Sequence, residues 1–264
     1  MTTKKEKSFT LIELLVVIAT IGLLASIIYV SLSGAREQAR IANSLSFEAQ
    51  IYHLVGIDAT GIWNFNEGVG STTVIDMSGN DNDGTISGAT YKCTGADTPN
   101  NEGCSLEFDG TNHHYVSIPN TEKFPLFSLS IWVYNEQGGD GRHSMLRDFW
   151  EIVGDRVCFW SYDFANDYWR CSNVGSVPYN KWTHIVTVWD GSVISHYING
   201  RLDWKDTNTS SGTSQSFYRI AGYSTRRFMG SLDNLRIYKQ ALPSAQIQKL
   251  YAEGLERHNL LTNK

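Results

Sequence analysis

The sequence lacks most of the motifs that identify catalytic and nucleic-acid-binding proteins. No glycine-rich phosphate loop follows an expected strand and opens a helix, and no CxxC or Cys–His spacing indicates zinc. The 264 residues carry a net charge of −5 and no basic stripe, so nucleic acid is not an expected ligand. No Ser–His–Asp arrangement can be assigned, and the glutamates are scattered. Presentation or binding is therefore the expected role.

A long apolar run dominates the N-terminal part of the chain. Phe9 to Val30 covers 22 residues, which as a helix would measure about 33 Å and would be long enough to cross a bilayer. The run is too long for an ordinary signal peptide. A simple signal anchor would not explain the lone carboxylate of Glu13, which is costly in hydrocarbon. Lys4, Lys5 and Lys7 precede the run, so this end is expected in the cytoplasm and the rest outside.

The order of features at this end resembles type IV pilins and pseudopilins. A basic leader is followed by a small residue, Ser8, and then by Phe9 with Glu13 four residues on. The resemblance implies that a prepilin peptidase cuts between Ser8 and Phe9, that the new amine is methylated, and that Glu13 is neutralised by the Phe9 amine of a neighbouring subunit. The chain departs from the family at Ser8, where glycine is usual, and at Val30, where many members have proline.

The helix is expected to continue beyond the apolar run. In residues 31–55, apolar side chains recur at steps of three and four and form one stripe. The sequence therefore predicts a leader at 1–8, a membrane and stalk helix at 9–55 and a linker at 56–60. The leader holds three lysines and one glutamate, so its removal changes the net charge from −5 to −7.

About 200 residues remain from Ile57 onward, enough for one sizeable core. Short apolar runs alternate with turn clusters, and Asp-Gly and Asn-Gly pairs recur between them. This pattern predicts a mainly β domain, an antiparallel sandwich, behind the long N-terminal helix.

An ordered series of short motifs resembles the laminin-G-like, concanavalin A-like jelly roll of bacterial surface proteins. The series runs GIWNFNEG at Gly61, DMSGN at Asp76, LEFDG at Leu106, LSIWV at Leu129, KWTHIV at Lys181, ING at Ile198 and GSLDNLRIY at Gly230. The family fold implies two antiparallel sheets over residues 61–256, with the closing strand LDNLRIYK beside the opening strand IWNFNE. A helix is predicted at Ser244–Glu253, ended by Gly254, with a tail at 257–264.

The four cysteines allow three disulfide connectivities. We favour Cys93–Cys104 and Cys158–Cys171, because each pair closes a local loop. Four buried free thiols are the alternative, and an extracytoplasmic domain favours disulfides. If Cys158 faces Cys171 across a hairpin, Trp160 faces Trp169 on the same side.

Calcium is the ion that the turns of this domain would suit, since it is bound by six to eight oxygens. The resemblance implies Asp109 and Asp233 as ligands, and Asp76 lies in a turn dense in oxygens. His113 and His114 stand where many relatives have an acid. The alternative is that these aspartates serve turn chemistry and helix caps.

The aromatic residues divide into two groups. Trp63, Trp132, Trp182 and Trp189 lie in strand patterns and are expected in the core. Six others lie in hairpins or turns and form a candidate ligand surface for glycans or proteins: Trp150, Trp160, Trp169, Trp204, Tyr162 and Tyr168. A second aromatic core beneath the hairpin explains them equally well.

The sequence therefore predicts a filament subunit, not an enzyme, that displays a lectin-like domain for surface adhesion. Some jelly rolls of this class are glycoside hydrolases, but their E-x-D-x-x-E motif is absent here. Its expected partners are prepilin peptidase, the membrane, copies of itself or other pilin-like subunits, and a glycan or cell-surface protein. The expected location is the inner membrane before assembly and a surface filament afterwards. The alternatives are a pseudopilin of a type II secretion or DNA-uptake system and a membrane-anchored lectin-like protein that does not assemble.

Overall fold

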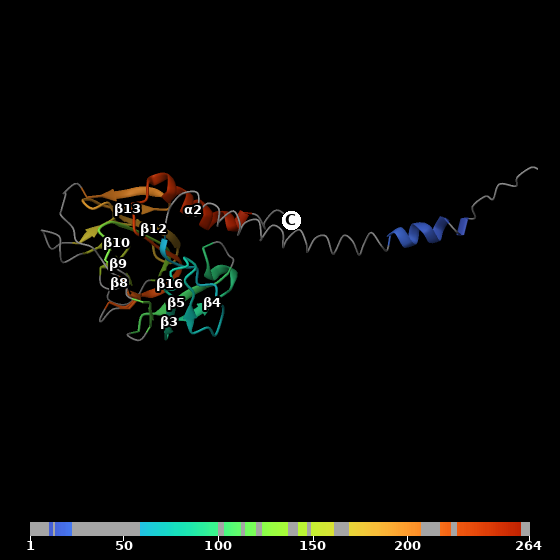
Figure 1. Cartoon of the computed structure of the whole chain (residues 1–264), viewed down its shortest axis with the longest axis horizontal. Coiled ribbons are helices and arrows are strands. Elements are labelled where there is room, and N and C mark those ends of the chain that lie inside the picture. The colour runs from blue at the N-terminus through green and yellow to red at the C-terminus, as the bar shows by residue number, and fades with distance from the viewer. Residues whose placement is uncertain are drawn as a thin grey trace, which may run out of the picture. The chain divides into compact units, whose positions relative to one another are not determined.

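The structure is a computed structural model of the chain (Figure 1). It describes residues 11–12, 14–22, 59–99, 103–111, 114–119, 123–136, 142–146, 149–160, 169–206, 217–222 and 226–259. The chain divides into two compact units, Met1–Ile57 and Asp58–Lys264. In the first unit, residues 11–12 and 14–22 are helical, as the apolar run predicts.

The second unit is built from two antiparallel sheets, each of eight strands among the described residues. Sheet A has the order β14 (Arg201–Lys205), β13 (Ile194–Ile198), β12 (Trp182–Trp189), β7 (Phe127–Asn135), β16 (Met229–Tyr238), β5 (Ser105–Asp109) and β4 (Thr90–Lys92), with β1 (Ala59–Trp63) paired to β16. Sheet B has the order β11 (Arg170–Cys171), β10 (Arg156–Phe159), β9 (Trp150–Val153), β8 (Arg142–Leu146), β15 (Arg219–Ile220), β6 (Tyr115–Ser117), β3 (Gly84–Ser87) and β2 (Thr73–Val74). A 3-10 turn, η1 (Gly95–Asp97), and a helix, α2 (Ser244–Asn259), complete the unit.

This architecture confirms the predicted antiparallel sandwich. The closing strand β16 pairs with the opening strand β1, with Trp63 opposite Leu235. The Asn-Gly signal between β13 and β14 forms a two-residue turn, because Asn199 and Gly200 have φ values of 49° and 76°, as a type I′ hairpin requires.

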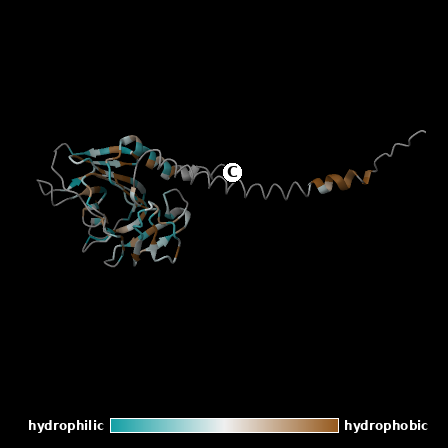
Figure 2. Cartoon of the chain, in the orientation of Figure 1, coloured by the Kyte–Doolittle hydropathy of each residue, from teal (hydrophilic) through white to brown (hydrophobic). Residues whose placement is uncertain are grey.

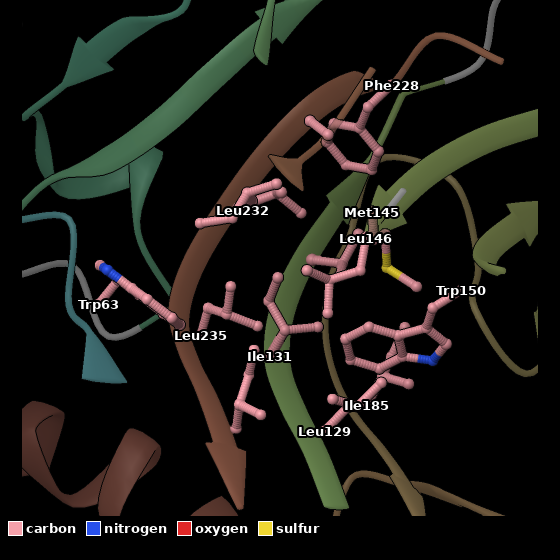
Figure 3. Close-up of a cluster of buried hydrophobic side chains, with 14 of the residues drawn as sticks. Trp63, Leu129, Ile131, Met145, Leu146, Trp150, Ile185, Phe228, Leu232 and Leu235 are labelled. Atoms are coloured by element: carbon pink, nitrogen blue, oxygen red, sulfur yellow. The ribbon is translucent and has the colours of Figure 1, made fainter. Parts of the chain in front are cut away.

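The hydrophobic core lies between the two sheets. Alternate residues of β7, namely Leu129, Ile131 and Val133, are fully buried and point toward sheet B. Leu146 of β8 and Trp150 of β9 meet them from the other sheet (Figure 3). Burying each such side chain contributes roughly 1.5–3 kcal/mol, so this layer holds the sheets together.

Three of the four tryptophans expected in the core are buried. Trp63, Trp132 and Trp189 are at most 4% exposed. Trp182 differs, because it is only partly buried and contacts Tyr134 at 5.7 Å between ring centroids.

Helix α2 corrects a prediction about its end. The sequence pattern predicts that Gly254 stops the helix, but α2 runs on to Asn259. A Cβ atom at Gly254 would lie 2.4 Å from the indole nitrogen of Trp132. Trp132 also stacks on Tyr251 of the same helix. The glycine therefore allows close approach of α2 to sheet A rather than ending the helix.

Candidate functional site

The residues predicted for processing and assembly, Ser8, Phe9 and Glu13, lie outside the described part of the chain, as does most of the predicted stalk. Apart from Thr20, the described helical residues of the first unit are apolar (Figure 2). Their side chains are exposed, with Leu11 at 80% and Ile12 at 74%. Among the described residues, no helix reaches both the length and the hydropathy of a membrane span.

Both favoured disulfides are present. Cys93 is bonded to Cys104 with an S–S distance of 2.05 Å, and Cys158 to Cys171 with a distance of 2.03 Å. Cys158 and Cys171 are opposite each other in the register of β10 and β11. The second bridge therefore joins the two outermost strands at this end of sheet B.

Strand register places a row of side chains on the outer face of sheet B, which we define as the face turned away from sheet A. Because Ile152 of β9 lies in the core, Glu151 points the other way. Glu151 is opposite Ser144 of β8 and opposite Cys158 of β10, which is opposite Cys171 of β11. Ser144, Glu151 and Cys158 are fully buried, and the Ser144 hydroxyl makes no hydrogen bond within the described residues.

Two tryptophans lie one step beyond this row, on the same face. The rings of Trp160 and Trp169 are 6.0 Å apart between centroids, with an interplanar angle of 27°. Both side chains are half-buried. The structure thus brings together the pair that the hairpin pattern predicted, whereas Tyr162 and Tyr168 lie outside the described residues.

Arg226 connects the aromatic pair to the polar row. Its Nη1 group donates a hydrogen bond of 2.9 Å to Glu151 Oε1, and its guanidinium lies 5.2 Å from the centre of the Trp169 ring. The Arg226 side chain is 28% exposed. We call Trp160, Trp169, Arg226, Glu151 and Ser144 the platform. No local pattern pointed to Arg226 or Ser144, because the strand order alone brings them to this face.

The other two tryptophans of the candidate ligand surface lie elsewhere. Trp150 is fully buried, which removes it from the candidate ligand surface. Its indole nitrogen donates a hydrogen bond of 2.8 Å to the Thr187 hydroxyl of sheet A. Trp204 is partly buried against the core and stacks on His196 at 5.7 Å. Trp150 therefore cannot contact a ligand, and Trp204 serves packing.

A buried polar network continues from Thr187 between the sheets. Thr187 is hydrogen-bonded to His196 Nδ1 at 2.9 Å, and His196 Nε2 lies 2.9 Å from the backbone oxygen of Arg170. Arg170 forms a buried ion pair of 2.7 Å with Asp206. Burial lowers the pKa of His196 to about 4, although the Arg170 carbonyl and Asp203 oppose the shift. His196 is thus a structural histidine.

His184 occupies a second buried position, on the outer side of sheet A under α2. Its Nε2 atom is 2.9 Å from the Ser130 hydroxyl, and its ring contacts those of Trp132 and Tyr251. Burial, and then the charge of Arg236, lower its pKa to about 3. A small pocket lies here, but the serine and histidine are buried and have no acidic partner at His184 Nδ1 among the described residues. This pair is consistent with packing rather than catalysis.

The three acids considered for calcium do not converge. The Asp76 carboxylate accepts four hydrogen bonds, from the backbone and hydroxyl of Ser78 and from the backbones of Ile62 and Asn82. It therefore fastens the turn after β2 to strand β1.

The two other acids lie on sheet A. Asp109 is half-exposed and pairs with His114 at 2.9 Å. Asp233 is buried in β16 opposite Trp132. The described residues contain no group of three or more His, Cys, Asp or Glu side chains that could hold a metal. The three acids therefore do not form one metal-binding group among the described residues, and calcium binding stays a prediction.

Two family models match the chain. The prokaryotic N-terminal methylation motif matches residues 3–29, and the concanavalin A-like lectin/glucanases superfamily matches residues 109–248, more than half of the sequence. Both resemblances that were drawn from the sequence are confirmed. No curated protein matches the chain significantly.

Solved structures with the same fold include a sugar-bound domain and the binding domains of toxins. Domain 4 of a GH43 extracellular arabinanase from Geobacillus stearothermophilus, in complex with arabinotriose, has a TM-score of 0.56 and 20% identity over 74% of this chain and 98% of that chain. The binding domain of Paraclostridial Mosquitocidal Protein 1 has a TM-score of 0.57 and 15% identity. That of botulinum neurotoxin serotype G has a TM-score of 0.54 and 15% identity. The last two matches cover 74% of this chain and about half of the other chain. At these identities the likeness concerns the fold alone.

Proposed function

Because the chain belongs to the concanavalin A-like lectin/glucanases superfamily and carries a prokaryotic N-terminal methylation motif, we propose that it is a pilin-like filament subunit that displays a lectin-like domain for surface attachment. The observation that carries this proposal is the presence of both features in one chain. Methylation motifs accompany subunits that pack through an N-terminal helix, and the second domain supplies a binding surface.

The N-terminal helix supports the assembly role. The side chains of Leu11, Ile12 and the residues that follow are apolar and mostly exposed (Figure 2). Such a surface needs a lipid or protein partner. Prepilin peptidase would cut after Ser8, and Glu13 would pair with the methylated Phe9 amine of the next subunit. The helix would lie in the membrane before assembly, with the second domain outside, and in the filament core afterwards.

The second domain supports a binding role rather than catalysis. Two disulfides fasten it, as suits an extracytoplasmic module. Its structural neighbours include the binding domains of toxins, and the arabinanase domain was solved with a bound sugar. The E-x-D-x-x-E motif of glycoside hydrolases with this type of fold is absent from its sequence.

The test is mass spectrometry of the chain recovered from sheared surface fibres, with and without reduction. We expect a chain that begins at N-methylated Phe9 and retains both disulfides. A Glu13→Ala chain should be cut and methylated but absent from fibres, whereas Glu6→Ala, in the leader, should assemble normally. A chain that keeps residues 1–8 and occurs only in membranes would contradict the proposal. Short periplasmic stubs with a secretion defect would favour a pseudopilin.

A further inference from the structure

We infer that the platform on the outer face of sheet B is a saccharide-binding site and that it takes neutral oligosaccharides. This inference rests on the proposed lectin-like function and names the surface and the class of ligand. A site for neutral oligosaccharides requires a stacking surface, hydrogen-bonding groups beside that surface, and a local charge near zero.

The stacking surface is the Trp160–Trp169 pair. Half-buried indole rings present a flat apolar area of the kind that packs against the C–H face of a sugar ring, while their buried edges hold them in place. The Cys158–Cys171 bridge lies two residues from each tryptophan along the chain. It fixes the separation of the two strands, so the rings are ordered before a ligand arrives and less entropy is lost on binding.

Polar groups lie next to the rings. Arg226 is 28% exposed and is held at Trp169 by its bond to Glu151, and a guanidinium offers several N–H donors in a fixed plane to sugar hydroxyls. The Ser144 hydroxyl is fully buried in the same row and makes no hydrogen bond within the described residues. Because Ser144 has no exposed surface, Arg226 is the polar group of the platform that a saccharide can reach directly.

The charge balance selects the class of saccharide. The single positive charge of Arg226 on the platform is neutralised by Glu151 at 2.9 Å. The whole chain is acidic, with a net charge of −5. Among the five platform residues, a carboxylated or sulfated glycan would find no unpaired cation, whereas a neutral oligosaccharide needs none. Arg156, the next outward-facing residue of β10, lies on the opposite side of Cys158 from Trp160. Binding should therefore depend little on salt.

Trp182 provides a matched comparison. It is also a half-buried tryptophan in contact with another aromatic ring, but it lies on sheet A and has no arginine stacked on it among the described contacts. If Trp160 only packs against its neighbours, its substitution should affect saccharide binding no more than that of Trp182. If Trp160 binds a sugar, its substitution should weaken binding whereas that of Trp182 should not.

The experiment uses the full-length chain in detergent on an array of neutral and carboxylated oligosaccharides, with arabinotriose, cellotriose and trigalacturonate followed by titration calorimetry. We expect neutral ligands alone to bind, equally at low and high salt. Trp160→Ala should weaken binding about tenfold, Trp160→Tyr should retain most of it, and Trp182→Ala should leave it unchanged. Reducing the Cys158–Cys171 bridge should weaken binding as well.

A second measurement needs no variant. N-bromosuccinimide oxidises exposed indoles, and peptide mapping of the wild-type chain should show that a bound neutral oligosaccharide protects Trp160 and Trp169 but not Trp182. Three outcomes would each overturn the inference: binding of carboxylated glycans instead, no neutral ligand on the array, or equal protection of all three tryptophans. Fibre assembly of the Trp160→Ala chain should be normal, so a failure here is distinguishable from a failure of the proposed filament role.

Discussion

Acid should weaken the second domain through His184, which is buried in its neutral form beneath α2. The ring lies between Trp132 and Tyr251, and Nε2 is hydrogen-bonded to Ser130. The charged groups that face it are Arg236 of β16 and Glu253 of α2, which form an ion pair of 3.4 Å. Burial and the Arg236 charge lower the His184 pKa from 6.5 to about 3.

The sign follows from proton binding. Between about pH 6.5 and pH 3, the unfolded chain binds a proton at this histidine that the folded chain does not, so stability falls as pH falls. At about pH 5 the loss from His184 is about 2 kcal/mol relative to neutral pH. His196, whose pKa is lowered to about 4, should add a similar amount. The two losses together are a large part of the stability of a typical domain.

The assay is urea unfolding of the full chain in detergent at about pH 7.5 and about pH 5. All eight tryptophans lie at or after residue 63, so their fluorescence reports the second domain alone. The His184→Phe chain keeps the ring contacts but cannot titrate, and it should lose about 2 kcal/mol less than wild type over this range. His114→Phe serves as a control, because His114 pairs with the half-exposed Asp109 and lies outside the core. An equal pH dependence in the wild-type and His184→Phe chains would refute the reasoning.

Three further predictions concern the stability of the second domain. Gly254→Ala places a Cβ atom 2.4 Å from the Trp132 indole nitrogen and should cost about 1–3 kcal/mol in thermal unfolding; an unchanged melting temperature would mean that α2 docks differently. Replacing Cys93 and Cys104 together by serine should cost about 2–4 kcal/mol in the same measurement, and no loss would mean that the bridge is not formed. Asp76→Ala leaves four hydrogen-bond donors without their acceptor and should lower the free energy of unfolding by at least about 2 kcal/mol. Calcium chelation should leave the wild-type melting temperature unchanged, and a drop on chelation would contradict the hydrogen-bonded role of Asp76.

The features that depend on local register could be predicted from the sequence. The Cys158–Cys171 bridge and the Trp160–Trp169 pair follow from a single hairpin, in which one cross-strand contact fixes the next. The antiparallel sandwich followed from alternation and turn signals, such as the Asn-Gly pair at Asn199. In each case the partners lie within a few residues of a turn.

Contacts between distant strands could not be predicted in the same way. Arg226 reaches Glu151 across 75 residues of sequence, and Arg170 reaches Asp206 across 36. These pairs depend on the order of strands in each sheet, and the strand order cannot be predicted from the secondary-structure propensities of the residues. The prediction that Gly254 ends the helix was wrong for a related reason. A glycine near a helix end has the same local sequence signature whether it ends the helix or makes room for a side chain such as Trp132.

Trp150 and Trp160 illustrate how strand parity separates a core residue from a surface residue. Trp150 of β9 is opposite Phe159 of β10, and both point into the sandwich. Trp160, the next residue, lies just beyond the end of β10 and stacks on Trp169, although both Trp150 and Trp160 occur in similar turn-rich sequence. The irregular register between Ser144 and Leu146 of β8 shows that one extra residue can shift this parity within a strand. Composition alone therefore groups the tryptophans together, whereas the register assigns Trp150 to the inter-sheet hydrogen-bond network and Trp160 to the platform.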